Sequence, residues 1–223
     1  MSTQQPRPSA AARREERREQ RHRAARERIL YAAWELARER GLMGWSLSEL
    51  GAAVGMRAPS LYVYFANKDA IYDELFAQGC RELLDLLRRV VDEGKTPTEQ
   101  FRDGSRVFLE FAVADPARLQ LLFLRVIPTF IPSQDSYALA MQITELLTEN
   151  LYQLGITDGA AADLWTATLT GLATQQVSNE PGGQRWVQLV DRAALAFLAT
   201  AAVQSQDPGR RARVSRSART GTR

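Results

Sequence analysis

The segment Ser46-Leu47-Ser48-Glu49-Leu50-Gly51-Ala52-Ala53-Val54-Gly55-Met56-Arg57-Ala58-Pro59-Ser60-Leu61-Tyr62-Val63-Tyr64-Phe65-Ala66-Asn67-Lys68-Asp69 holds the signals for two short helices, a tight turn and the start of a third helix. Ser46 and Glu49 have the spacing of a capping box, in which each side chain satisfies a backbone N–H of the first helical turn. Gly55 suits a left-handed turn, and Pro59 suits the first turn of the next helix, where its missing N–H costs little. The spacing predicts a helix-turn-helix.

The stretch from Ser60 to Ile71 resembles the recognition helix and following helix start of the TetR family of bacterial transcriptional repressors. Upstream, the apolar positions that end at Gly41-Leu42 are similar to the first helix of that family, so the resemblance runs from about residue 26 to about residue 72. It implies a homodimeric repressor that binds a palindromic operator in double-stranded DNA and responds to a small-molecule inducer.

A helix in the major groove presents its N-terminal residues to the base edges. The candidates for these contacts are Arg57, Ala58, Ser60 and Tyr62, with Pro59 shaping the approach. Arg57 suits either a bidentate contact to guanine or a phosphate clamp, and both readings stay open. Tyr62 and Tyr64 are expected to donate their hydroxyls to phosphates while their rings pack on the headpiece. Leu61 and Phe65 are expected to point into the core.

Two further positions lie at expected helix starts, where unpaired N–H groups and the positive end of the helix dipole favour an anion. These are Ser46 and Lys68, and we expect the backbone there to hold phosphates. Lys68 adds a full positive charge. The alternative reading of Lys68 is an ordinary solvated surface lysine.

Positive charge is concentrated at the two ends of the 223-residue chain, although its formal net charge is only +3. Residues 1–40 hold 11 Arg against 6 Glu, and residues 207–223 hold 6 Arg against 1 Asp. We predict a disordered basic arm over residues 1–22, a DNA-binding domain over 23–66, a helical regulatory and dimerisation domain over 67–204 and a disordered basic tail over 205–223. The positive charge of the arm suits binding to the phosphate backbone of DNA, but such a charge is also typical of a segment that is simply exposed to solvent.

The rest of the inventory argues against catalysis, a metal, a cofactor or membrane insertion. The only histidine is His22, Cys80 is the only cysteine, and no glycine-rich phosphate loop or nucleophile elbow is present. Cys80 lies in an apolar helical run and is expected to be a buried, reduced thiol. No secretory signal or run of roughly 18 apolar residues occurs, which favours a cytoplasmic protein. The competing function is a nonspecific binder of nucleic acid or membrane surfaces through the arginine-rich ends.

Apolar residues recur at spacings of three and four throughout the chain, and Gly, Pro and Asx residues punctuate the joins, so we predict an all-α fold of about nine helices. Asn67 is expected to cap a long fourth helix, and Thr96 with Glu99 forms a second capping box. The last two helices, roughly 158–178 and 184–204, are rich in Ala and Gly. Small residues let helices approach closely, and the family resemblance implies a four-helix dimer interface there. The alternative is an ordinary intrachain core.

The larger domain also carries residues that suit an apolar pocket with a few polar anchors. The candidates for lining a ligand pocket are Phe108, Phe111, Phe130, Met141, Gln142, Trp165, Thr166, Thr170 and Asn179. Aromatic residues at helical spacing also occur as plain core, and composition does not separate a filled core from an open cavity. The sequence names neither the effector nor the operator, and it does not distinguish repression from activation.

Overall fold

In a computed structural model, described for residues 10–205, the chain forms nine α-helices and one short 3₁₀ helix, with no strand in that range. The all-helical prediction is confirmed. None of the helices in the described range is long and apolar enough to span a bilayer. In chain order the helices are α1 (Ala10–Arg40), α2 (Leu47–Ala53), α3 (Ala58–Leu61), α4 (Lys68–Asp92), α5 (Pro97–Ala114), α6 (Pro116–Phe123), α7 (Gln134–Gln153), α8 (Ala160–Asn179), η1 (Val187–Leu189) and α9 (Val190–Ser205).

Polar caps determine where several of these helices begin. Ser46 and Glu49 form the predicted capping box at α2, with the Glu49 N–H donating to Ser46 Oγ at 3.2 Å and the Ser46 N–H donating to Glu49 Oε2 at 2.8 Å. Asn67 caps α4 by accepting a backbone N–H of its first turn at 2.8 Å. Thr96 and Glu99 repeat the capping box at α5. Each such cap stabilises its helix by about 1 kcal/mol.

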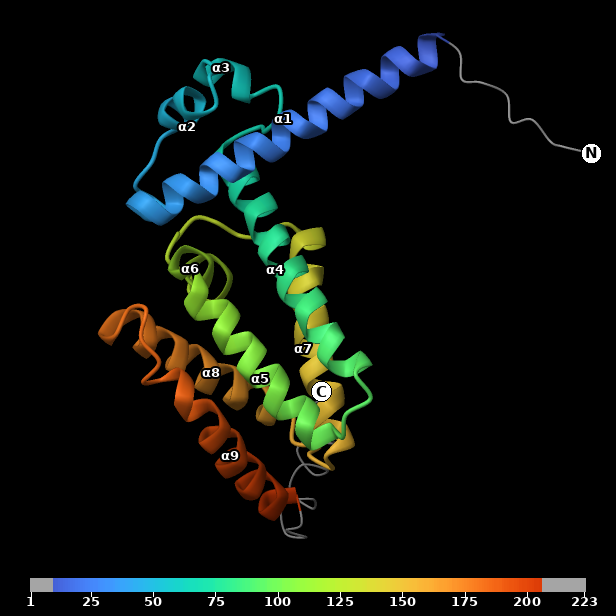
Figure 1. Ribbon diagram of the computed structural model, residues 1–223, viewed down its shortest axis with the longest axis vertical. Coiled ribbons are helices and arrows are strands. Elements are labelled where there is room, and N and C mark those ends of the chain that lie inside the picture. Colours follow the sequence, from blue (N-terminus) through green and yellow to red (C-terminus); the bar gives the residue numbers. More distant parts are fainter. Residues whose placement is uncertain (1–9, 206–223) are drawn as a thin grey trace, which may run out of the picture.

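Helix α1 is longer than predicted. The sequence favoured a disordered or transiently helical arm over residues 1–22, and residues 10–22 form a helix that continues without a break into the buried part of α1. Residues 1–9 lie outside the described part of the chain, as does the predicted tail from residue 206 onward. Ala, Arg, Glu and Gln have high helix propensity, so a helix already held by tertiary packing extends into this exposed segment at little cost. The extension projects beyond the other helices (Figure 1).

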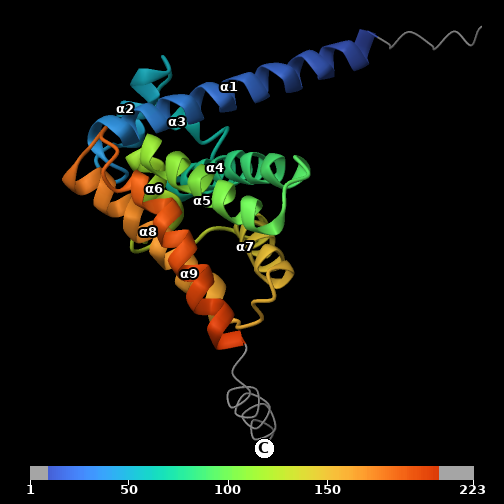
Figure 2. The same ribbon diagram turned by 60° about the horizontal axis from the view of Figure 1, so that its bottom comes forward.

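The helices form a small headpiece and a larger bundle (Figures 1 and 2). One hydrophobic cluster joins α1, α2 and α3 to the first half of α4, and includes Ile29, Trp45, Leu61 and Ile71. A second cluster, centred on Trp165, joins the second half of α4 to α5, α8 and α9. Helix α7 runs alongside α4, and α6 lies between α4 and α1. Helix α4 is therefore the element that both clusters share.

Two glycines give the turn between α2 and α3 its shape. Gly55 has φ +70°, a left-handed backbone conformation that other L-residues adopt at a cost. Gly51 is needed for a different reason. A Cβ atom placed on it would lie 2.8 Å from the Met56 carbonyl oxygen and 3.2 Å from the Ala58 nitrogen, both of which are backbone atoms. The close crossing of α2 and the start of α3 therefore requires a residue without a side chain.

Arg26 ties three headpiece elements together. Its guanidinium donates to the Tyr64 carbonyl after α3, forms an ion pair with Glu74 of α4 at 3.1 Å, and lies 4.2 Å from the centre of the Phe65 ring. The planar, forked guanidinium makes these contacts at the same time, which a lysine ammonium does not reproduce. No sequence pattern pointed to this role of Arg26.

We expect Gly51→Val to lower the free energy of unfolding by about 1–3 kcal/mol, because the new side chain meets backbone atoms that move only with the whole turn. Ala52→Val is the matched control, since Ala52 is exposed on the same helix and loses only about 0.7 kcal/mol or less of helix propensity. Urea unfolding followed by circular dichroism measures both. Equal losses at the two positions would contradict the close-crossing explanation.

Arg26→Lys should lower the free energy of unfolding by about 1–3 kcal/mol, because the Tyr64 carbonyl and Glu74 lose a hydrogen-bond donor in a half-buried place. Arg28→Lys, at an exposed position of the same helix, keeps the same charge and is expected to change stability by less than about 0.5 kcal/mol. Thermal unfolding of both variants provides the comparison, and an Arg26→Lys protein as stable as the Arg28→Lys protein would refute the clamp.

Candidate nucleic-acid interface and adjoining cavity

The segment from Arg57 to Phe65 divides into a buried set and an exposed set. Leu61 and Phe65, predicted to point inward, are 1% and 4% exposed, so that prediction is confirmed. Tyr62 and Val63, which lie between them, are 57% and 70% exposed. Of the other candidate contacts in the segment, Arg57, Pro59 and Ser60 are exposed, and Ala58 and Tyr64 are half-buried. A helix held by its inner residues thus presents a mixed polar and apolar outer surface.

The two tyrosines of this segment differ in their surroundings. The Tyr64 ring lies 4.9 Å from the His22 ring of α1, measured between ring centres, so Tyr64 packs on the headpiece as expected. The Tyr62 ring is mostly exposed. Of the pair, Tyr62 therefore has the freer hydroxyl for an incoming ligand.

Lys68 is held in place by the headpiece. Its Nζ donates to the Trp45 carbonyl at 2.6 Å and lies 4.0 Å from the centre of the Trp45 ring and 5.3 Å from that of Tyr72. Burial lowers the pKa of this ammonium from its usual value, and the nearby Asp69 carboxylate acts in the opposite direction. An ammonium has three N–H donors, and the Trp45 carbonyl uses one of them. Lys68 is thus a positioned cation at the first turn of α4 and not a freely solvated lysine.

Ser46 serves its own helix cap. Its hydroxyl donates to Glu49 Oε2 at 2.8 Å and accepts the Glu49 N–H. The hydrogen bonds that the Ser46 hydroxyl and the Ser46 backbone N–H donate to the Glu49 carboxylate lower the pKa of that carboxyl, and the carboxylate also pairs with Arg40. A negative charge therefore already lies at the start of α2, where the sequence analysis expected a phosphate.

Val63 is a candidate contact that the sequence analysis did not single out. Because Leu61 and Phe65 are four residues apart and both buried, helical spacing places residue 63 on the opposite side, and its exposure agrees with this. An exposed apolar side chain beside polar base-reading candidates suits the methyl group of thymine. The pattern of buried positions was sufficient to find it.

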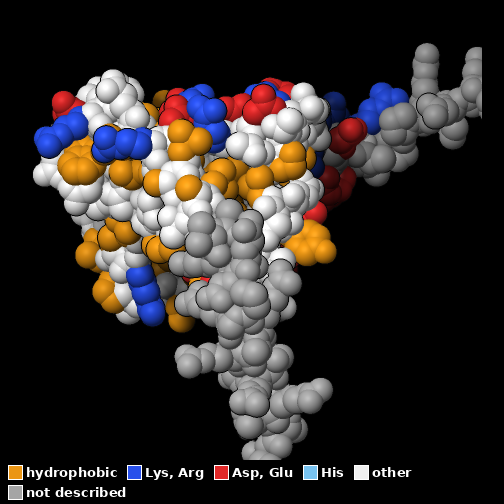
Figure 3. Space-filling model, turned by 90° about the horizontal axis from the view of Figure 1, so that it is seen from below, with side chains coloured by type: hydrophobic (Ala, Val, Ile, Leu, Met, Phe, Trp, Pro, Cys, Tyr) orange, Lys and Arg blue, Asp and Glu red, His pale blue; other side chains and the backbone are white. Residues whose placement is uncertain are grey.

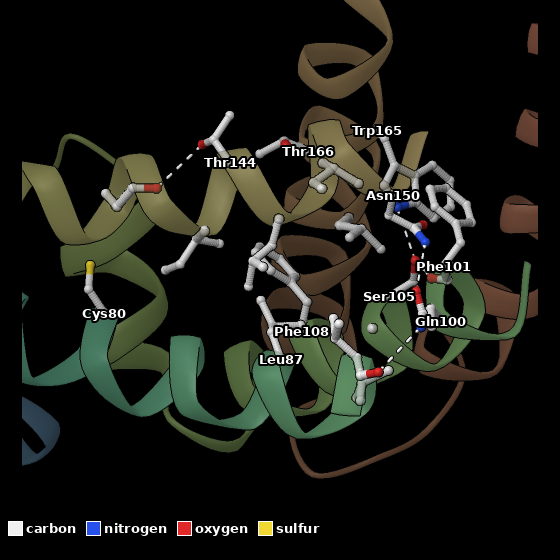
Figure 4. Close-up of a pocket in the computed structure, with 18 of the residues that line it drawn as sticks. Cys80, Leu87, Gln100, Phe101, Ser105, Phe108, Thr144, Asn150, Trp165 and Thr166 are labelled. Atoms are coloured by element: carbon white, nitrogen blue, oxygen red, sulfur yellow. Dashed lines mark hydrogen bonds between the residues drawn. The ribbon is translucent and has the colours of Figure 1, made fainter. Parts of the chain in front are cut away.

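A cavity of about 210 Å³ lies farther down the molecule, enclosed by residues of α4, α5, α6, α7 and α8 (Figure 4). Its lining is mainly apolar, and none of the described residues that line it carries a charge. Cys80 lies at one end, and Gln100, Asn150 and Trp165 gather at the other (Figure 4). Burial raises the pKa of the Cys80 thiol to about 12, against the opposing effect of the Arg81 charge, so the thiol stays protonated at neutral pH.

Some of the predicted pocket residues meet at this cavity. Phe108, Trp165 and Thr166 line it, whereas Phe130 lines a neighbouring cavity of about 430 Å³ that shares Leu122, Phe123 and Ala140 with the first. Three polar residues of the lining were not predicted from the sequence, namely Gln100, Ser105 and Asn150. They are common polar residues on amphipathic helices, and no sequence pattern sets them apart.

Other predicted pocket residues line neither of these two cavities. Phe111 is buried in the core, and the centre of its ring lies 4.6 Å from the Arg118 guanidinium. Met141 is 41% exposed, Gln142 accepts a hydrogen bond from Arg88 at 2.9 Å, and Asn179 is exposed and bonds to Gln175 on its own helix. Thr170 is also absent from the lining. Successive helical residues turn by about 100°, so neighbours of lining residues face elsewhere.

Helices α8 and α9 pack on α5 through one side and leave the other side open. Trp165 and Ala194 face inward, whereas Leu164 and Leu195 are 61% and 55% exposed. Small residues accompany these leucines on the open side, namely Ala167, Gly171, Ala196 and Ala199. Seen from below, the face at which α9 ends shows mostly apolar and uncharged side chains, with most of the charged ones toward its upper edge (Figure 3).

The comparisons with known proteins agree with this architecture. Residues 29–75, which span α2, α3 and the adjoining parts of α1 and α4, match the family model described as "Bacterial regulatory proteins, tetR family". An uncharacterized HTH-type transcriptional regulator of Bacillus subtilis (strain 168), YobS, is 32% identical over 126 residues. That match covers 56% of this chain and 64% of the relative, so the chain spans less than two thirds of the relative's length.

Solved structures share the fold over most of the chain. The crystal structure of SCO4313 has a TM-score of 0.69 at 21% identity and covers 81% of this chain and 98% of that one. FadR from Bacillus subtilis, in complex with stearoyl-CoA, has a TM-score of 0.57 at 19% identity and covers 77% of this chain and 97% of that one. Residues 29–75 thus match the tetR family of bacterial regulatory proteins, and the helical domain that follows shares the fold of these solved structures.

Proposed function

We propose that this protein is a homodimeric, ligand-responsive transcriptional regulator that represses by binding a palindromic operator in double-stranded DNA in the cytoplasm. The observation that carries the proposal is the exposed outer surface of residues 57–64, held rigidly by the buried Leu61 and Phe65. Arg57, Ala58, Pro59, Ser60, Tyr62 and Val63 would face the bases, and Tyr64 and Lys68 would face phosphates. Ser46 contributes through the backbone of the first turn of α2.

The dimer would form through the open side of α8 and α9. A single four-residue α3 offers too few base contacts for specific binding, and two copies related by a two-fold axis read two half-sites about one DNA turn apart. The exposed Leu164 and Leu195, surrounded by Ala and Gly, let two helix pairs approach closely. A surface of exposed leucines and small residues suits a contact between identical chains.

Regulation would pass through α4. This helix lines the cavity with Leu87 and Val90, and begins at Lys68 beside the headpiece. A ligand that binds only one tilt of α4 would change the separation of the two α3 helices. A hundredfold change in operator affinity requires about 2.7 kcal/mol of differential binding between the two states.

Selection of bound sequences from random DNA duplexes tests the proposal directly. The expected product is an inverted repeat whose half-sites lie about one helical turn apart. Recovery of sequences without a common motif would favour the competing function, a nonspecific binder that acts through its basic ends.

Arg57→Ala and Lys68→Ala should have different effects on DNA binding. If Arg57 reads a base, its loss costs about 1–3 kcal/mol on the selected site and relaxes preference at one position, whereas loss of Lys68 weakens all sequences alike and reduces the salt slope by about one. Arg89→Ala removes the same charge from an exposed position of α4 outside the headpiece and should leave binding unchanged. Fluorescence anisotropy on selected and random duplexes at several salt concentrations measures this. Equal losses on both duplexes for both variants would defeat the assignment.

Leu195→Glu should convert the dimer to a monomer, because two like charges would be buried against each other at the interface. Tyr152→Glu introduces the same charge at a 65%-exposed apolar residue of α7 and should leave the dimer intact. Analytical ultracentrifugation distinguishes the two. A Leu195→Glu protein that still sediments as a dimer would place the interface elsewhere.

A further inference from the structure

The cavity between α4 and α8 has chemical features that restrict its ligand. Its lining, wholly within the described part of the chain, has no acidic or basic side chain. At about 210 Å³ it is smaller than the roughly 300–1,000 Å³ that drug-sized ligands occupy. An ion without a partner is strongly disfavoured in such a place, because burial removes its hydration. These features favour a small and uncharged molecule.

The polar end of the cavity has a fixed order of donors and acceptors (Figure 4). Gln100 Nε2 donates to the carbonyls of Val91 and Lys95, at 3.4 and 3.2 Å, so Gln100 Oε1 is turned the other way. Asn150 Nδ2 donates to that Oε1 at 3.4 Å and to the Pro97 carbonyl at 3.0 Å. Both partners of Asn150 Nδ2 are acceptors, so the nitrogen of the Asn150 amide must face them. Asn150 Oδ1 is therefore the atom of this amide that faces away from them.

Asn150 Oδ1 is buried and has no hydrogen-bond partner among the described residues. The other polar groups nearby are satisfied. Ser105 Oγ donates to the Phe101 carbonyl and accepts the Trp165 indole N–H at 3.0 Å. A buried amide oxygen without a donor is costly, and a ligand that supplies one removes that cost. Asn150 lines the cavity, but its Oδ1 has almost no accessible surface, so a donor in the cavity meets this requirement only with a small movement of the Asn150 side chain.

We propose that the cavity binds a small neutral molecule, mainly hydrocarbon, that carries one O–H or N–H group donating to Asn150 Oδ1 and an apolar body directed toward Cys80. That this molecule is the effector of a regulator rests on the proposed function. A carboxylate in the same position would place its own acceptor oxygens against Asn150 Oδ1, which is also an acceptor. No cation in the lining would compensate the negative charge. Ionised fatty acids, whose carboxylates lack the donor, are thus disfavoured here, although the fold is shared with a stearoyl-CoA complex.

Calorimetry on the full-length protein, without DNA, tests the ligand class. The probes are two matched sets: octan-1-ol, methyl heptyl ether and octanoate, then 1-naphthol, 1-methoxynaphthalene and 1-naphthoate. We expect at least one alcohol to bind tenfold or more tightly than its ether, with no detectable binding of either carboxylate. Failure of both alcohols to bind at millimolar concentration, or tighter binding of a carboxylate, would overturn the proposal.

Two variants connect the result to the structure. Asn150→Leu should reduce the preference for alcohol over ether to less than twofold, because the acceptor is gone. Gly104→Leu should abolish binding by filling the cavity from α5, where a Cβ meets only Leu87 Cδ2, at 3.7 Å. This second variant keeps the test valid if Asn150→Leu unfolds, and circular dichroism checks both. Alcohol binding that survives Gly104→Leu would place the ligand elsewhere and overturn the proposal.

Measurement of operator binding distinguishes failure of the proposed ligand class from failure of the proposed regulatory function. An alcohol that binds with the expected preference and lowers operator affinity supports both proposals. The same preference in a protein that selects no DNA motif supports the ligand class and refutes the regulatory function.

Discussion

The structure depends most on one constraint, namely that α4 belongs to two hydrophobic clusters at once. Ile71 and Leu75, near its start, are fully buried in the headpiece cluster, and Leu83, two turns further on, is fully buried in the cluster of the larger bundle. An α-helix is a stiff rod, because every bend disturbs its i to i+4 hydrogen bonds. The headpiece therefore cannot be positioned independently of the bundle, and the orientation of α3 follows from the packing of a helix that extends far beyond it.

A second connection restrains the headpiece from the opposite side. Asp115, only 6% exposed, accepts two backbone N–H groups at the start of α6 and a hydrogen bond from Arg38 Nε of α1 at 2.9 Å. A buried carboxylate that loses its cationic partner is strongly destabilised, so α1 and α6 tend to move together. With α4 on one side and this ion pair on the other, the headpiece has two attachments to the bundle. In the proposed dimer, a rotation about these two attachments would change the spacing of the two headpieces without unfolding either cluster.

The sequence predicted those features that local chemistry decides. The capping box of Ser46 and Glu49, the Asn67 cap and the inward positions Leu61 and Phe65 each depend on a few neighbouring residues, and all were found in the structure. The pocket was less predictable. Met141 and Ala140 are neighbours on α7, and which of them faces the cavity depends on how α7 is rotated about its axis. Contacts with residues far away in the chain determine that rotation. The long-range contacts of Arg26 and Asp115 were missed for the same reason, since their partners lie 38 and 77 residues away in the chain. The helical arm of residues 10–22 reflects a weak propensity made effective by the packed helix that it extends.

The position of the cavity along α4 explains why this helix is firm at one end and adjustable at the other. Its first turns are surrounded by Trp45, Phe65 and Phe130, whereas the stretch from Leu87 to Val91 borders open volume. Side chains next to a void lack dispersion contacts on one side, so small changes in tilt there cost little. Under the proposed regulatory function, a ligand in this cavity would supply those contacts for one tilt alone, and the stiffness of α4 would carry the result to Lys68 and the headpiece.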